Sequence, residues 1–132
     1  MNKFLLFIFF IISLASCNRR DANLKEILIN ADSIAVNLYK GTGRMDSVGR
    51  VLIIRDAPTI KSWVEMIIES RKAYQPHCGT DGSLHFFRNN RVAMDIYFRR
   101  GDVACRQFSY LLHGKWRATK LGEEAVAIMG NW

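Results

Sequence analysis

The sequence is poor in proline, with 2 in 132 residues, and it has no proline-rich linker, internal repeat or low-complexity stretch. It also lacks a long apolar run, because the longest, Phe4–Ile12, has nine residues, whereas a membrane-spanning helix needs about 20. Hydrophobic residues make up 49% and charged residues 23%, a composition typical of globular proteins that excludes disordered and collagen-like chains. The length therefore predicts a single folded domain.

Motifs that carry chemistry are also missing. No C-x-x-C or H-x-x-x-H pair is present, no Gly-x-Ser-x-Gly surrounds a serine, and no Lys-Ser or Lys-Thr pair follows Gly41-Thr42-Gly43 to close a phosphate loop. The sequence thus predicts no catalytic residue, metal site or cofactor. The polar residues weighed for such roles and set aside are His77, His85, His113, Ser83, Ser109, Asp81, Asp95 and Asp102.

The amino terminus has the organisation of a secretory signal peptide. Lys3 supplies a positive charge, Phe4–Ile12 supplies a short apolar core, and small residues follow before the charged run at 18–21. This order predicts cleavage after residue 16. An ordinary signal peptide followed by a chance cysteine is the plainer alternative.

The residues at the cleavage site resemble a bacterial lipobox. Leu14-Ala15-Ser16-Cys17 has an aliphatic residue, two small residues and then cysteine. The resemblance implies that Cys17 is acylated and becomes the first residue of a lipoprotein anchored in the cell envelope. Two or three acyl chains hold a protein firmly to a bilayer. Asn18, where aspartate would favour inner-membrane retention in some bacteria, favours the outer membrane. Arg19-Arg20 differ from the acidic run that resembles a surface-export signal in some lineages, which favours the periplasmic face.

Two cysteines remain once Cys17 carries lipid. An oxidising envelope and an even number of cysteines predict a Cys78–Cys105 disulfide, although two buried free thiols are an alternative. Such a bridge would close a loop of about 28 residues and contribute roughly 3–4 kcal/mol by the chain-entropy argument.

Positive charge is concentrated in one part of the chain. Residues 71–120 carry ten basic and three acidic side chains, whereas residues 17–70 are nearly balanced. Such a bias attracts anionic partners, which in an envelope are anionic lipids, lipopolysaccharide phosphates or acidic proteins. Nucleic acid is not expected there. The alternative is a solvated surface that keeps the protein soluble.

Periodicity predicts the fold. Residues 33–39 form a half-buried strand, and residues 48–55, apolar on both faces in the middle, predict a strand inside a sheet rather than at its edge. Asp56 and Pro58 predict the start of a helix, whose apolar stripe at i, i+3, i+4, i+7 and i+8 is made to cover a sheet. That stripe consists of Ile60, Trp63, Val64, Ile67 and Ile68.

Four further strands and a short helix complete the prediction. Residues 84–88 and 91–98 should form a hairpin with a three-residue loop, which groups Leu84 and Phe86 with Val92, Met94, Ile96 and Phe98 on one face. Strands at 103–112 and 115–119 and a helix at 121–129 follow. The order ββαββββα predicts a two-layer α+β domain with an antiparallel sheet over residues 32–132. Residues 17–31 are expected to be the lipidated cysteine and a tether with a short helix at 24–28.

The functional hypotheses rest on surface and location. A short tether and a small α+β domain are similar to small envelope lipoproteins, which implies a non-enzymatic binding or accessory module. The candidate partner-binding residues are Arg99, Arg100, Arg106, Phe108 and Tyr110, because arginine and aromatic residues are enriched at interfaces. The alternative places Phe108 in the core beneath the helix. An inhibitor of a periplasmic or host hydrolase, acting through the loop 74–82, is the second hypothesis, and a small enzyme is the third.

Overall fold

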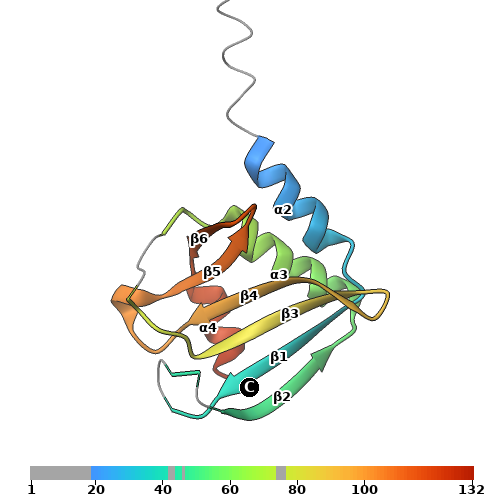
Figure 1. Ribbon diagram of the computed structural model, residues 1–132. Helices are drawn as coiled ribbons and strands as arrows, with labels where there is room; N and C mark the ends of the chain where they lie inside the picture. Colours follow the sequence, from blue (N-terminus) through green and yellow to red (C-terminus); the bar gives the residue numbers. More distant parts are fainter. Residues whose placement is uncertain (1–18, 42–43, 46, 74–76) are drawn as a thin grey trace, which may run out of the picture.

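A computed structural model describes residues 19–41, 44–45, 47–73 and 77–132 (Figure 1). All neighbouring strands pair antiparallel in one six-stranded sheet with the order β2-β1-β3-β4-β5-β6. This confirms the predicted α+β class and the strand succession. The elements are helix α2 (Arg19–Ile29), strands β1 (Ser33–Tyr39) and β2 (Val48–Ile54), helix α3 (Ala57–Glu69), strands β3 (Gly82–Arg88) and β4 (Arg91–Arg99), the 3₁₀ turn η1 (Val103–Cys105), strands β5 (Gln107–Leu112) and β6 (Lys115–Lys120), and helix α4 (Glu123–Met129).

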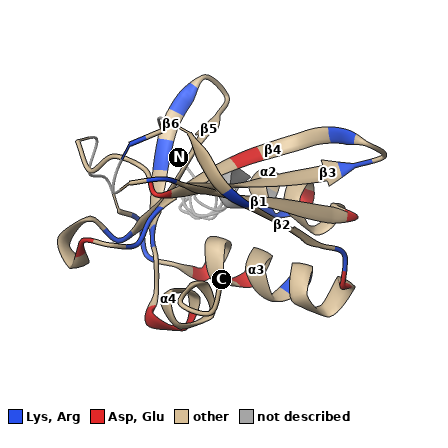
Figure 2. Cartoon of the chain, turned by 90° about the horizontal axis from the view of Figure 1, so that it is seen from below, with Lys and Arg blue, Asp and Glu red and all other residues tan. Residues whose placement is uncertain are grey.

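One apolar core lies between the helices and one face of the sheet. Figure 2 shows α3 and α4 on the same side of the sheet, and buried residues of all three helices join the same cluster as buried strand residues. Trp63 of α3 is 1% exposed and packs edge-on against Phe108 of β5, with ring centroids 6.4 Å apart. The predicted stripe of α3 is confirmed, as is its start, where the Asp56 side chain accepts a hydrogen bond from Thr59 N.

Helix α2 belongs to the packed body. Leu24 and Leu28 are 3% and 0% exposed and are part of the core, because they lie four residues apart on one face of the helix. The short helix expected in the tether is present and longer than predicted, and from Leu24 onward it is folded onto the domain. Cys17 and the whole predicted signal peptide lie outside the described residues.

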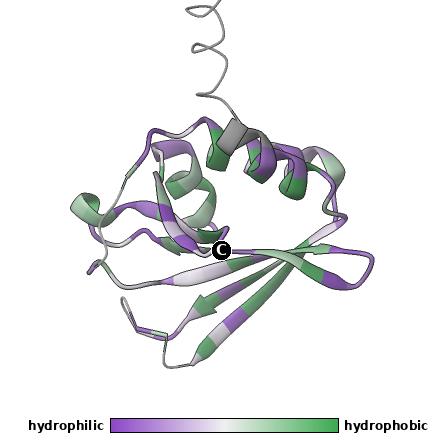
Figure 3. Ribbon diagram, turned by 45° about the horizontal axis from the view of Figure 1, so that its top comes forward, coloured by the Kyte–Doolittle hydropathy of each residue, from purple (hydrophilic) through white to green (hydrophobic). Residues whose placement is uncertain are grey.

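The predicted position of strand β2 inside the sheet is wrong. The strand runs over Val48–Ile54, but it forms an edge of the sheet and pairs only with β1 among the described residues. Val51 and Ile53 are 54% and 53% exposed. An apolar run on both faces is typical of an interior strand, and here it produces an edge strand with an exposed apolar face, visible as the green segments of the lower strands in Figure 3.

The β3–β4 hairpin reaches its predicted face by another route. Its loop has two residues, Asn89 and Asn90, both with positive φ, as a type I′ turn requires. A register shift between Phe86 and Phe87 then brings Phe86 opposite Met94 and Leu84 opposite Ile96. The predicted three-residue loop is therefore wrong, and so is the inward position of Val92, which is exposed. The bulge in β4 inserts one extra residue into the strand, which has the same effect on the facing of the later residues as one extra residue in the loop.

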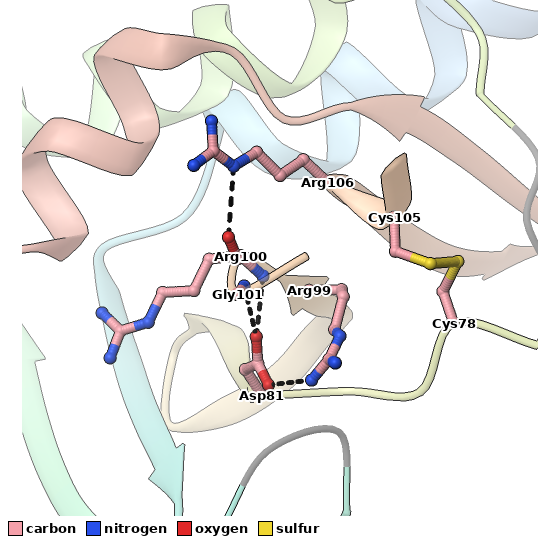
Figure 4. A network of polar contacts seen from close by, with 7 residues as sticks. All are labelled: Cys78, Asp81, Arg99, Arg100, Gly101, Cys105 and Arg106. Carbon is pink, nitrogen blue, oxygen red and sulfur yellow. Dashed lines mark hydrogen bonds and ion pairs between the residues drawn. A yellow bond between two sulfur atoms is a disulfide. The ribbon is translucent and has the colours of Figure 1, made fainter. Parts of the chain in front are cut away.

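The chain between β4 and β5 also departs from the prediction. Residues 103–105 form η1 rather than the start of a strand, since the Asp102 side chain accepts a hydrogen bond from Ala104 N and caps the turn. This turn places Cys105 beside Cys78, and the two form a disulfide with Cα atoms 5.4 Å apart. The predicted pairing is thus present in the structure (Figure 4).

Candidate functional site

The face of the sheet turned away from the helices, here called the outer face, is the surface most open to a partner. Strand side chains alternate between faces, so the outer face carries the residues between the core positions. No described helix belongs to this side, since the buried residues of α2, α3 and α4 join the core on the other. Its residues include Ala35, Asn37 and Tyr39 of β1, Val51 and Ile53 of β2, Ser83, His85 and Phe87 of β3, Asp95 and Tyr97 of β4, Leu111 of β5 and Trp116 of β6.

A chain of hydrogen bonds crosses the middle of the outer face. The Tyr39 hydroxyl donates to Ser83 Oγ at 3.1 Å, and Ser83 Oγ lies 2.8 Å from His85 Nε2. His85 Nδ1 lies 2.6 Å from an Asp95 carboxylate oxygen. Because a carboxylate accepts, Nδ1 carries a proton, and in the neutral ring Nε2 is then the acceptor that faces Ser83 Oγ and the Asn37 amide nitrogen, 3.0 Å away.

This polar chain has the order of a serine–histidine–acid triad, in which a base activates a hydroxyl. Its serine, however, is 0% exposed. Ser83 also lies on a central strand between Asn37 and Tyr97, so nearby backbone N–H groups are directed into the ladders rather than toward a substrate oxygen. The arrangement as it stands fixes the orientation of His85 across three strands and presents no nucleophile at the surface.

Tyr97 borders the polar chain. Partial burial raises the pKa of its hydroxyl, and the negative charge of Asp95 and the neighbouring Tyr39 add to the rise. Tyr97 therefore stays neutral well into the alkaline range. Its ring packs at 6.0 Å, centroid to centroid, against Trp116.

Strands β4 and β5 diverge beyond this aromatic pair. They pair only where residues 97–99 meet residues 107–109, and a shallow pocket of about 350 Å³ opens next to Asp95. Val92, Leu111 and Trp116 line it, and each is at least 50% exposed. The outer face thus has a polar centre with exposed apolar side chains at both ends.

The two edges of the sheet differ as well. Residues 71–73 lie along β6, with Ala73 N donating to Ala118 O, Lys120 N donating to Arg71 O, and a bridge between Lys72 and Thr119. Along β2, by contrast, no described residue pairs with the outward edge. The backbone groups that point outward from an edge strand are available to another strand.

Three predicted partner-binding arginines hold the domain together internally (Figure 4). Arg99 forms an ion pair with the buried Asp81 at 2.5 Å, and Asp81 also accepts from the backbone N–H groups of Arg100 and Gly101. Arg100 Nη1 donates to the Met129 carbonyl at 2.5 Å. Arg106 donates to the Arg100 carbonyl and forms an ion pair with Glu123.

The two predicted aromatic contact residues are in the core. Phe108 and Tyr110 are 0% and 4% exposed, so the alternative position beneath α3 is the one the structure has for Phe108. Arg106, Phe108 and Tyr110 do not form a shared surface. Other basic side chains are exposed, and those at the hairpin tips (Figure 2) include Arg88, Arg91 and Lys115.

The polar chain was missed by sequence reasoning. His85 was set aside as a surface residue, although Ser83 and His85 are two residues apart and therefore share one face of the strand. What the sequence does not contain is the register that brings Asn37, Tyr39 and Asp95 to them. Among the described residues, no group of three or more His, Cys, Asp or Glu side chains is arranged to hold a metal ion.

No protein family, curated protein sequence or solved structure matches this chain. Of the helices within the described ranges, none has the length and apolar character needed to span a membrane.

Proposed function

We propose that this protein is a lipid-anchored lipoprotein of the bacterial envelope that binds a protein partner through strand β2, without enzymatic activity of its own. The observation that carries the proposal is the exposed apolar edge of the sheet at β2. The lipobox-like residues Leu14–Cys17 support the anchor and the periplasmic side of the outer membrane as its location.

Strand addition is the binding mode that suits this edge. A partner segment in extended conformation would pair with the outward backbone groups of β2 and cover Val51 and Ile53 with its own side chains. Arg50, also exposed, directly precedes Val51 and lies opposite Leu38, on the other face of the same edge, where it adds an acidic preference to the partner. The opposite edge, along β6, is already occupied by residues 71–73.

The position of β2 relative to the anchor is also favourable. Helix α2 begins beside the β5–β6 hairpin, where Asn23 Nδ2 lies 3.4 Å from His113 Nε2, and β2 is at the other edge of the sheet (Figure 1). An anchor on Cys17 would therefore hold the β6 side toward the membrane and leave β2 directed toward proteins of the periplasm.

Metabolic labelling tests the anchor. An azido fatty acid should label the full chain expressed in its envelope, and Cys17→Ala should abolish the label and release processed protein from membranes. Labelling that persists in Cys17→Ala would contradict the anchor.

Site-specific photo-crosslinking tests the partner. A photoreactive residue at Ile53 should give a discrete crosslinked protein, and the matched position Val92, also about half exposed but on the other hairpin, should not. Val51→Lys should abolish the crosslink while leaving the melting temperature unchanged. Equal crosslinking from both positions would show non-specific contact and contradict a β2 site.

Inhibition of a hydrolase is a second candidate. Residues 77–82 of the loop 74–82 are held by the Cys78–Cys105 disulfide and by the hydrogen bonds of Asp81, and a rigid loop is what a blocking inhibitor requires. Rates of envelope proteases and glycosidases measured with and without the protein test this function, and unchanged rates would exclude it.

A further inference from the structure

The proposed anchor and the folded body are separated by very little chain. Cys17 precedes the first residue of α2 by two positions, which span at most about 7.6 Å between Cα atoms. Leu24, five residues into the helix, is buried in the core and lies only about 7.5 Å further along the helix axis. An acylated Cys17 would thus hold the start of α2 and its neighbours at the bilayer surface.

A pocket of about 450 Å³ lies next to helix α2. Leu24 of α2, Ile68 near the end of α3, and Trp116 and Arg117 of β6 all contribute to its lining. The pocket therefore lies at the end of the domain that the anchor directs toward lipid, and its lining comes from α2, α3 and the residues after it, β5 and β6.

The charge of the pocket suits a monoanion. Its charged lining residues are Glu69, Lys72 and Arg117, with a net charge of +1. Arg117 Nε and Thr119 Oγ1 are buried and have no hydrogen-bond partner among the described residues. Buried polar atoms are normally paired, and a ligand with acceptor oxygens could supply the missing partners after a small change of side-chain rotamer.

Trp116 adds an interfacial side chain. It is 58% exposed, lies next to the β5–β6 turn and lines the same pocket. Lys115 beside it is also exposed. Tryptophan and basic residues are both enriched where a protein meets lipid headgroups.

We infer that this pocket binds the phosphodiester headgroup of an anionic phospholipid in the leaflet that holds the anchor. Arg117 and Lys72 contact the phosphate, Thr119 donates to it, and Trp116 lies at the level of the headgroups. The inference rests on the proposed lipidation of Cys17. It adds a lipid site and a fixed orientation on the membrane to the proposed function.

Tryptophan quenching in vesicles tests the site with the full lipidated chain. Phosphatidylcholine vesicles would contain equal small fractions of either brominated phosphatidylglycerol or brominated phosphatidylcholine. Brominated phosphatidylglycerol should quench the protein's fluorescence at least twofold more, because the pocket enriches that lipid beside Trp116. Trp116→Phe should remove the difference, since Trp63 is buried in the core and Trp132, which does not line the pocket, packs against Trp63.

Matched variants identify the contacts. Arg117→Gln with Lys72→Gln should abolish the excess quenching, whereas Arg88→Gln with Arg91→Gln removes the same charge from the other hairpin tip and should leave it intact. Thr119→Val should halve the excess and leave the melting temperature unchanged or raised, because the lost hydroxyl has no described partner in the fold. Circular dichroism confirms that each variant is folded.

Each outcome decides the proposal. Equal quenching by the two brominated lipids, or equal loss in both double variants, would overturn the lipid site. Loss of the excess on adding inorganic phosphate would show a free-phosphate site instead. Fatty-acid labelling of the same samples separates these results from failure of the anchor: labelled protein without excess quenching overturns only the lipid site, and unlabelled protein overturns the anchor.

Discussion

The two faces of the sheet are built from the same strands and have opposite chemistry. The inner face presents Ile34, Val36, Leu84, Phe86 and Ile96, all 0% exposed, and three helices cover it. The outer face has a hydrogen-bonded polar chain at its centre and exposed apolar side chains toward its edges. The difference indicates that the inner face supplies stability, while the outer face and its β2 edge are left uncovered by the described helices.

Replacing one tryptophan on each side gives the largest contrast. Trp63→Ala should destabilise the domain by about 3–5 kcal/mol, because a large buried side chain leaves a cavity. Trp116→Ala should change the free energy of unfolding by about 0.5 kcal/mol or less, as exposed substitutions do. Urea unfolding measures both, and similar losses would contradict the distinction between the faces.

Overfilling the inner face tests how closely it is packed. A Cβ at Gly82 would lie 2.4 Å from the Asn37 carbonyl oxygen and 2.4 Å from Phe98 Cζ. Gly82→Ala should therefore cost about 1–3 kcal/mol. Gly122→Ala, where a Cβ meets nothing within 4 Å, is the control for crowding and should cost less, because only the preference for glycine over alanine at the N-cap of α4 is lost.

The contrast between the faces also explains what the sequence could predict. Periodicity is local, so β1 and α3 and their buried residues were predicted correctly. The place of β2 depends on which strands pair, and an apolar run does not distinguish an interior strand from an exposed edge. The β3–β4 face was predicted from the wrong loop, because a two-residue turn plus a bulge gives the same facing as a three-residue loop.

Polar partners were the least predictable. Arg99, Arg100 and Arg106 find acceptors at Asp81, Met129 and Glu123, which are 17 to 29 residues away in sequence. Counting charges along the sequence finds each arginine but does not show whether its guanidinium is paired within the fold. The chain through His85 has the same character, since its members come from β1, β3 and β4.

Breaking the polar chain should have an intermediate effect. His85→Leu removes the acceptor of Ser83 and the donor to Asp95, and groups left without partners cost about 1–3 kcal/mol. The double variant with Asp95→Leu should lose less than the sum of the two single variants, because both remove the same bond. Additive losses in urea unfolding would show that His85 and Asp95 do not act together.

Reactivity of Ser83 is expected to be absent despite its triad-like partners. A fluorophosphonate probe should not label the folded protein, since Ser83 is fully buried on β3 between β1 and β4 and its hydroxyl is bonded to Tyr39. Mass spectrometry of wild type and Ser83→Ala checks this. Labelling found in wild type and lost in Ser83→Ala would establish a hydrolase and replace the proposal of a binding module.

The smallest effect concerns the cap of the helix that covers the inner face. Hydrogen bonds from the Thr59 hydroxyl and from Thr59 N hold the pKa of Asp56 below its ordinary value of 3.8, with slight burial opposing them. A carboxyl with a lowered pKa in the folded state contributes stability above the unfolded value, and loses it as pH falls through the folded value. Asp56→Ala should therefore lower the melting temperature slightly at neutral pH and have no effect at a pH well below 3.8. Thr59→Val, which keeps the carboxylate and its backbone bond, should show a smaller form of the same pH dependence in thermal unfolding from neutral to acidic pH. A difference between wild type and Asp56→Ala that stays constant across that range would mean that the charge on the cap does not stabilise α3.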